Sequence, residues 1–184
     1  MTPALLQRLR PPRPSATDTG RRFAVVVLIA ALVVVMVPRR HEGAVPLEDY
    51  GPELARARER APYAVLVPEG LPRGWRPVSA RVSGGPGEGT VHWHLGFHTT
   101  RGKYAAVEQA NGEYRQFADR MTIDGKAHGR RRIGDVTWTE RANPGRGHRS
   151  LVRTAGGTTV VVTGTAGWPE LARLAGSLRP AGSS

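Results

Sequence analysis

Residues 91–98 read Val-His-Trp-His-Leu-Gly-Phe-His, in which apolar side chains alternate with histidine or glycine. The apolar positions are Val91, Trp93, Leu95 and Phe97. Successive side chains of a β-strand point to opposite faces, so this stretch predicts a strand with one buried face. Thr99-Thr-Arg-Gly102 follows as a hairpin connection, and Lys103-Tyr-Ala-Ala-Val-Glu-Gln109 returns as the partner strand. We therefore expect Trp93 and Leu95 in the core of an antiparallel sheet.

Short strands and helices are expected on both sides of this hairpin. Further strands are predicted at residues 63–67, 74–82, 131–141, 149–154 and 158–165, and helices at 53–61, 113–121 and from Pro169 until Pro180. The last helix carries an apolar stripe, Trp168, Leu171, Leu174, Ala175 and Leu178, that must be buried against the sheet. Short connections imply antiparallel pairing. The predicted fold class is α+β: an antiparallel β-sheet covered by helices, preceded by one transmembrane helix.

The transmembrane helix is predicted from residues 23–37, fifteen consecutive residues without a polar side chain. As a helix they span about 22 Å at about 1.5 Å per residue, and flanking arginines can extend the span toward the roughly 30 Å hydrocarbon core. We expect a signal anchor over residues 21–40, after a disordered cytoplasmic tail over residues 1–20. An extracytoplasmic stalk over 41–52, the α+β domain over 53–180 and a disordered tail over 181–184 follow.

Arginine is concentrated around the apolar segment, with five residues before it and two directly after it. The positive-inside rule then places the N-terminus in the cytoplasm and the domain outside, so we expect a single-pass cell-membrane protein. The alternative is a cleaved signal peptide. Residues 37–43 offer no small-residue cleavage site, and 22 residues before the apolar run are long for a signal peptide. We therefore favour the uncleaved anchor.

The formal net charge of +12 and the absence of cysteine limit the function classes. Without cysteine the domain has neither disulfides nor a lipoprotein anchor, and it must fold on its own hydrophobic core. For a domain outside the cell we expect no nucleic-acid partner. The sequence contains no G-x-S-x-G, H-E-x-x-H or Walker motif, so hydrolase, zincin and P-loop NTPase assignments have no motif support. We expect no cofactor and favour a role without catalysis.

His92, His94 and His98 fall on one face of the 91–98 strand, and a His-x-His pattern can present two imidazoles to zinc. This pattern predicts, as an alternative function, a metal-dependent envelope enzyme. The other interpretation is a solvent-exposed polar face, because the apolar positions of the strand point the other way. The partner strand is expected to present to the histidines Ala105, Val107 and Gln109.

Glu108 is then expected on the apolar face of the hairpin, near Trp93 or Leu95. A carboxylate is costly in such a place unless it is paired or close to the sheet edge. One interpretation is a raised pKa and an acid/base role. We favour the other, an ion pair with one of the many arginines.

Arg130, Arg131 and Arg132 form a basic cluster, which follows His128-Gly129 and leads into a predicted strand. Anionic lipid headgroups and wall polymers are available outside the cell, so the cluster predicts a site for such ligands. The alternative is a charged loop end without a ligand. We accordingly expect a membrane-anchored extracytoplasmic domain that binds an envelope protein or an anionic envelope ligand without catalysis.

Several short motifs follow one another behind the N-terminal span. They are Leu71-Pro-Arg-Gly-Trp-Arg76, His94-Leu-Gly-Phe97, Lys103-Tyr-Ala-Ala-Val-Glu-Gln109, Val161-Val-Thr-Gly-Thr-Ala166 and the stripe from Leu171 to Leu178. In this order they resemble the actinobacterial domain-of-unknown-function 4245 family, over residues 62–178. The resemblance implies a membrane-anchored envelope protein of uncharacterised role and assigns no catalytic residue. The strands followed by a terminal helix are also similar to sandwich folds of the Mog1 and PsbP type, a likeness of fold alone.

We expect an N-terminal reporter on the full-length chain to face the cytoplasm and a C-terminal reporter to face the outside, because of the arginine asymmetry. Protease added to intact cells stripped of their wall should digest the C-terminal domain. Mass spectrometry of the mature protein should find residues 1–40 retained. An N-terminus near residue 44 would identify a cleaved signal peptide instead.

Overall fold

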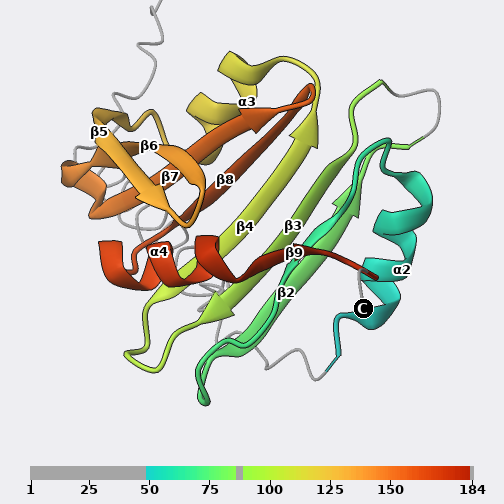
Figure 1. Ribbon diagram of the computed structural model, residues 1–184, viewed down its shortest axis with the longest axis horizontal. Coiled ribbons are helices and arrows are strands. Elements are labelled where there is room, and N and C mark those ends of the chain that lie inside the picture. Colours follow the sequence, from blue (N-terminus) through green and yellow to red (C-terminus); the bar gives the residue numbers. More distant parts are fainter. Residues whose placement is uncertain (1–48, 86–88, 183–184) are drawn as a thin grey trace, which may run out of the picture. The chain divides into compact units, whose positions relative to one another are not determined.

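The computed structural model describes residues 49–85 and 89–182 (Figure 1). The predicted cytoplasmic tail, signal anchor and most of the stalk lie outside these residues, as do residues 183–184. Within the described ranges, no helix is long and apolar enough to cross a membrane. The structure therefore describes mainly the domain predicted over residues 53–180, and its first helix begins at Gly51.

Two antiparallel sheets form the framework of the described part of the chain. The larger has seven strands in the order β2 (Arg76–Ser83), β3 (His92–His98), β4 (Tyr104–Asn111), β8 (Thr158–Gly164), β7 (His148–Ala155), β6 (Val136–Asn143) and β5 (Lys126–Ile133). The smaller pairs β1 (Leu66–Pro68) with β9 (Leu178–Pro180). This arrangement confirms the predicted α+β class with an antiparallel sheet.

The described α-helices are α2 (Gly51–Arg60), α3 (Tyr114–Met121) and α4 (Trp168–Ser177), and a short 3-10 turn, η1 (Pro144–Arg146), joins β6 to β7. Val160 and Val162 of β8 pack in the same cluster as Leu171 of α4, whereas Val161 packs with Phe117 of α3. Alternate residues of a strand face opposite ways. Helices α3 and α4 therefore cover opposite faces of the larger sheet, and α4 lies in front of it in Figure 1.

The main hydrophobic core lies between the larger sheet and α4. Trp93, Leu95, Leu171 and Leu174 are fully buried in it, which confirms the inward direction predicted for the 91–98 alternation and for these two leucines of the terminal stripe. We call this side of the larger sheet the core face. The predicted end of the terminal helix at Pro180 is wrong, because the helix ends at Ser177 and Leu178–Pro180 pair with β1 as β9. Trp93 also donates a hydrogen bond from Nε1 to the Leu66 carbonyl oxygen at 3.2 Å. It thus ties the β1 segment to the sheet as well as filling the core.

Residues 131–141, predicted as one strand, belong instead to the two antiparallel strands β5 and β6. Ile133 pairs with Val136 across a two-residue turn, Gly134-Asp135. Gly134 has a φ of +57°, a left-handed conformation that glycine adopts without steric cost. A glycine next to aspartate between two strand-forming runs is a typical hairpin signal. The single-strand prediction is wrong because this turn divides the segment.

The β3–β4 hairpin has a different register from the one predicted. Five residues separate the two strands, so His98 lies opposite Tyr104 and His94 lies opposite Glu108. The prediction assumed a four-residue connection, and a shift by one residue moves every side chain of β4 to the other face. The side chains expected beside the histidines, those of Ala105, Val107 and Gln109, lie on the core face. Glu108, expected near Trp93 or Leu95, lies beside the histidines instead.

The opposite side of the larger sheet carries His92, His94 and Glu108, and we call it the histidine face. The expectation of a solvent-exposed polar face is wrong at its centre, because His94 and Glu108 are each 7% exposed. Helix α3 covers part of this face. The Phe117 ring meets the His92 ring edge-on, with 5.1 Å between the ring centroids. Helix α3 thus covers the sheet beside His92, whereas the contacts given for His94 come from Ser79, Glu108 and Tyr104 of the sheet itself.

A Trp93→Ala substitution should lower the free energy of unfolding by about 3–5 kcal/mol, because it leaves a large cavity and removes the bond to the Leu66 carbonyl. Tyr114→Ala is the matched control, since this aromatic side chain is 39% exposed, and it should cost within about 0.5 kcal/mol. Denaturant unfolding of the full-length chain, followed by circular dichroism, measures both. Equal midpoints for Trp93→Ala and wild type would contradict the packing of β3.

Candidate functional site

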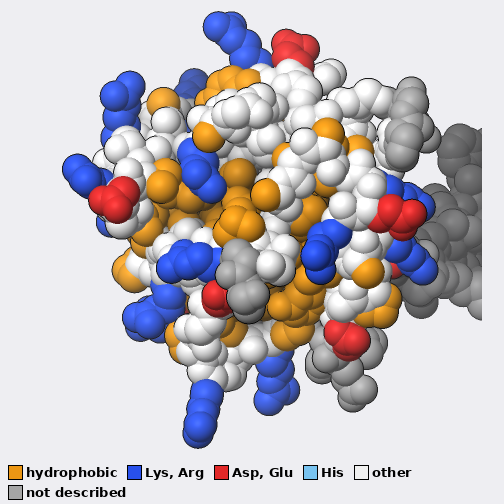
Figure 2. Space-filling view, turned by 45° about the vertical axis from the view of Figure 1, so that its right-hand side comes forward, with side chains coloured by type: hydrophobic (Ala, Val, Ile, Leu, Met, Phe, Trp, Pro, Cys, Tyr) orange, Lys and Arg blue, Asp and Glu red, His pale blue; other side chains and the backbone are white. Residues whose placement is uncertain are grey.

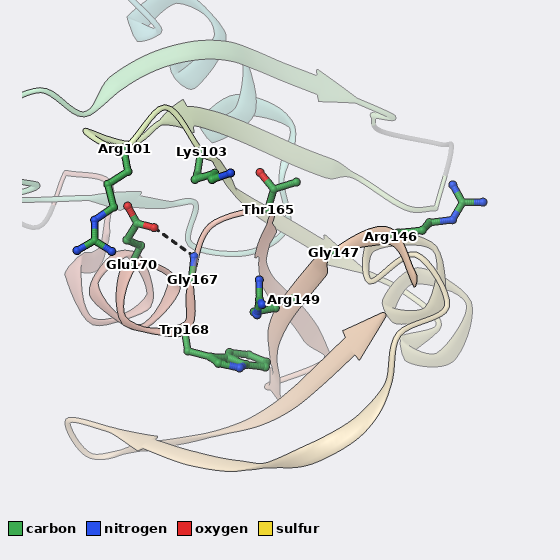
Figure 3. Close-up of a pocket in the computed structure, with 9 residues that line it drawn as sticks. All are labelled: Arg101, Lys103, Arg146, Gly147, Arg149, Thr165, Gly167, Trp168 and Glu170. Carbon is green, nitrogen blue, oxygen red and sulfur yellow. Dashed lines mark hydrogen bonds between the residues drawn. The ribbon is translucent and has the colours of Figure 1, made fainter. Parts of the chain in front are cut away.

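A pocket of about 670 Å³ lies where the β3–β4 connection, the start of β7 and the N-terminus of α4 meet (Figure 3). Its lining residues are Arg101, Lys103, Arg146, Gly147, Arg149, Thr165, Gly167, Trp168 and Glu170. These residues come from separate segments of the sequence, and basic side chains are the largest group among them. The pocket is therefore the candidate functional site of the domain.

Hydrogen bonds to the Tyr104 backbone hold these segments together. Thr165 Oγ1 accepts a hydrogen bond from the Tyr104 N–H at 3.1 Å, and Ala166 N–H donates to the Tyr104 carbonyl oxygen at 3.0 Å. The end of β8 approaches β4 closely at Gly164, where an added Cβ would lie only 2.1 Å from the Tyr104 carbonyl oxygen. Glycine at this position allows the β8–α4 segment to lie beside the β3–β4 connection. The backbone segments that line the pocket are thus held next to each other by these bonds.

The described lining of the pocket carries four basic side chains and one carboxylate. Arg149 is half-buried and points into the pocket in Figure 3, whereas Arg146 extends away from its centre. The carboxylate of Glu170 accepts a hydrogen bond from the Gly167 N–H at 3.1 Å, an interaction typical of the third residue of a helix. This described carboxylate caps α4 and keeps its negative charge, but four basic side chains against one carboxylate leave the lining net positive.

Trp168 forms an apolar wall of the same pocket. Its ring stacks on the ring of His128, with 6.0 Å between the centroids and an interplanar angle of 6°. The sequence places Trp168 in the buried stripe of the terminal helix, but the structure leaves it half-buried at the pocket. The pocket therefore offers both positive charge and a flat apolar surface to a ligand.

The three predicted ligand-binding arginines lie on β5, and the strand alternation separates them. Arg131 is half-buried and pairs with Glu140, on the face that carries Trp138. Arg130 and Arg132 are exposed and point the other way, and Arg132 lies 3.4 Å from Asp135. None of the three lines the pocket.

Other basic side chains are spread over the surface. Figure 2 shows Lys and Arg side chains around the visible face, with Asp and Glu side chains between some of them. On this face of the described residues the basic side chains are thus distributed, and they do not by themselves locate a site. Sequence reasoning missed Arg101, Lys103 and Arg149, because no local motif links positions that only the folded chain brings together.

The predicted metal ligands do not form one group. His92 Nε2 and His94 Nδ1 bond separate oxygens of Glu108, at 2.8 Å and 2.7 Å, whereas His98 lies against the Tyr104 ring with 6.4 Å between the centroids. Within residues 49–85 and 89–182, no three His, Cys, Asp or Glu side chains are arranged to hold a metal ion. The arginine partner expected for Glu108 is wrong, since its partners are the two histidines.

The ionisation of Glu108 is set by opposing influences. Burial alone would raise the pKa of this carboxyl, but hydrogen bonds from His92 and His94, together with their positive charge when protonated, lower it. The net result is a pKa below the ordinary value for glutamate. The raised pKa considered for this residue from the sequence is therefore wrong, and the ionised carboxylate is the form that the fold favours.

Residues 17–178 match the model of the family described as "Protein of unknown function (DUF4245)". The chain belongs to this family. The family match confirms the resemblance carried by the sequence motifs. No curated protein matches the chain.

A solved structure described as the crystal structure of MucB in complex with MucA(peri) is similar over 64% of this chain and 37% of that chain. Its sequence identity is 18% and its TM-score 0.34. The chain thus spans well under half the length of that protein, and a likeness at this level carries no functional argument.

We expect a Glu108→Gln variant to be less stable than wild type at neutral pH. Because folding lowers the pKa of this carboxyl, its ionised form contributes stability that is fully present above the unfolded pKa, roughly 4.3. That contribution is lost as pH falls through the lower pKa of the folded state. The difference between variant and wild type should therefore shrink below about pH 4. Urea unfolding across this range measures it, and Glu69→Gln, at an exposed carboxylate, should show no such difference.

Proposed function

We propose that the protein is a membrane-anchored extracytoplasmic domain that binds an anionic ligand in the pocket lined by Arg101, Lys103 and Arg149, and that this pocket itself is a binding site without catalysis. The observation that carries the proposal is the gathering of these cations at one hollow, where they outnumber Glu170, the described carboxylate of the lining, whose Oε2 accepts the Gly167 N–H. The ligand chemistry is a phosphate or phosphodiester group, available in lipid headgroups and envelope polymers.

The charge and geometry of the pocket favour such a group. A guanidinium presents a planar set of N–H donors that matches phosphate oxygens, and such charge-assisted bonds are stronger than neutral ones. Arg149 is half-buried, so solvent screens its charge less than it screens the exposed Arg101 and Lys103. Trp168 adds an apolar wall for the part of the ligand that carries the phosphate. Together these side chains can hold a charged group next to an apolar one.

The predicted anchor would place this binding site near anionic ligands of the cell envelope. A signal anchor over residues 21–40 would keep the domain close to the outer surface of the membrane, where anionic lipids and polymers are concentrated. Tethering raises the effective concentration of such ligands, so a pocket of modest intrinsic affinity suffices. The basic run on β5 would contribute long-range attraction of anions rather than the specific contacts.

The test uses the full-length chain in phosphatidylcholine nanodiscs, with inorganic pyrophosphate as the probe in calorimetric titration. Wild type should bind pyrophosphate, with an affinity that falls as salt is added. Arg149→Gln should weaken binding about tenfold, the effect of losing one charge-assisted hydrogen bond. Arg115→Gln is the matched control, because it removes the same charge at an exposed position of α3, on the opposite face of the sheet. It should leave pyrophosphate binding unchanged.

Two further measurements identify the source of the phosphate group and test whether the arginines of β5 bind it instead. Binding to phosphatidylglycerol vesicles that Arg149→Gln weakens would identify lipid headgroups as the source, and pyrophosphate binding without vesicle binding would identify a soluble or polymeric phosphate. A loss caused by Arg130→Gln but not by Arg149→Gln would move the site to β5 and overturn the proposal. Equal losses of pyrophosphate affinity in Arg115→Gln and Arg149→Gln would show that binding depends on the net charge of the protein and not on this pocket.

A further inference from the structure

A β-bulge in β2 determines where the side chain of Ser79 lies. Pro77 pairs with Phe97, but the register then shifts, so that Ser79 pairs with Gly96 and Val78 has no partner of its own. With an unbroken register Ser79 would lie opposite Leu95, on the core face. The extra residue turns Ser79 to the histidine face instead. Bulges that redirect a side chain in this way are frequent beside active sites.

Gly96 leaves open the space that Ser79 uses. Its backbone is not in a left-handed conformation, so the chain path does not require glycine. An added Cβ, however, would lie 2.5 Å from Ser79 Oγ and 2.4 Å from the Tyr104 hydroxyl oxygen. Any larger residue would displace both hydroxyl groups from their positions next to His94. Glycine is therefore needed at position 96 to leave space for the two hydroxyl groups, and not because of its backbone conformation.

A continuous series of hydrogen bonds runs from Ser79 to a carboxylate. Ser79 Oγ lies 2.8 Å from His94 Nε2, and His94 Nδ1 lies 2.7 Å from Glu108 Oε1. An ionised carboxylate only accepts hydrogen bonds, so His94 donates from Nδ1 and, when neutral, keeps a free electron pair on Nε2. That electron pair is the acceptor for the Ser79 hydroxyl proton. The other oxygen of Glu108 bonds His92 Nε2 at 2.8 Å, which fixes the carboxylate.

We propose that Ser79, His94 and Glu108 form a nucleophile, a general base and a positioning carboxylate that accept an acyl group from a carboxylic ester. Such triads are recognised by geometry and not by sequence order, so the absence of a G-x-S-x-G motif does not bear on it. The site is on the histidine face of the sheet, whereas Arg149 is on the core face. It is therefore separate from the anion pocket and does not depend on the proposed binding function.

The chemistry follows from the hydrogen-bond series. Ser79 Oγ attacks the ester carbonyl carbon while His94 Nε2 takes the hydroxyl proton. The tetrahedral intermediate then expels the alcohol, which receives that proton from His94, and the acyl group remains on Ser79. A water molecule gives a proton to His94 and attacks the acyl carbon, and Ser79 leaves with the proton returned from His94. One ester and one water become one acid and one alcohol.

Tyr104 is the donor placed to stabilise the negative charge of the tetrahedral intermediate. Its hydroxyl oxygen lies 3.4 Å from His94 Nε2, on the same side as Ser79 and over the same glycine. A hydroxyl that converges on the nucleophile in this way can donate to the oxyanion. Because β2 is an edge strand and Ser79 is only half-buried, a small ester can reach the nucleophile from the open side of the sheet.

The test incubates the full-length chain in phosphatidylcholine nanodiscs with p-nitrophenyl acetate. Wild type should release a burst of one p-nitrophenolate per chain and gain the mass of one acetyl group, which peptide mapping places on Ser79. Ser79→Ala should show neither, with an unchanged melting profile. Ser83→Ala is the matched control, because Ser83 is exposed on the same strand and face, opposite His92, and it should acylate like wild type. If wild type is acylated no more than Ser79→Ala, the proposal is overturned.

Glu108→Gln tests the positioning role separately. We expect acylation of the folded variant to slow on the order of 10²-fold or more with the KM for the ester unchanged, because the amide introduced at position 108 no longer fixes the His94 tautomer that leaves Nε2 as the acceptor. The other charged or titratable groups facing His94 are Tyr104 on β4, Arg81 on β2 and His92 on its own strand. They are unchanged in this variant. An acylation rate of the folded variant equal to that of wild type would contradict a role for Glu108 beyond stability.

Discussion

The register of the β3–β4 hairpin is the constraint on which the rest of the domain depends. Five connecting residues put His94 opposite Glu108 and Leu95 opposite Val107. A connection shorter by one would place the Glu108 carboxylate beside Trp93 in the main core, where burial without a partner is costly. The same register thus builds an apolar core on one face and pairs a buried carboxylate with two imidazoles on the other.

The two faces of the larger sheet have different physical roles. The core face packs against α4 and, through the Trp93 bond to Leu66, against the β1 segment, so most of the hydrophobic stabilisation arises there. The histidine face is covered only in part by α3, and its uncovered portion carries hydroxyl and imidazole groups. The main apolar core and the proposed acyl-transfer cluster thus lie on opposite faces of one layer of strands, while the proposed anion pocket lies at one end of the core face.

The proposed anion pocket arises at one end of the sheet. Arg101 and Lys103 extend from the hairpin connection, Arg149 from β7 and Trp168 from α4, and hydrogen bonds between Tyr104 and residues 165–166 hold the segments together. The connection that sets the β3–β4 register therefore also supplies two of the cations. For a family described only as of unknown function, the pocket and the serine-centred cluster provide two separately testable chemical roles.

The sequence by itself determined the α+β class, the inward direction of Trp93 and Leu95, the terminal helix and the family. The first three depend on periodicity within single segments, which local sequence records, and the family depends on the order of short motifs along the chain. Only the tertiary structure decided that Glu108 meets His94 and that a bulge turns Ser79 toward it. The face on which a residue of a neighbouring strand lies depends on the length of the connection and on bulges, which are properties of paired backbones. The alternation of side chains within one strand contains no information about the length of the connection or the position of a bulge.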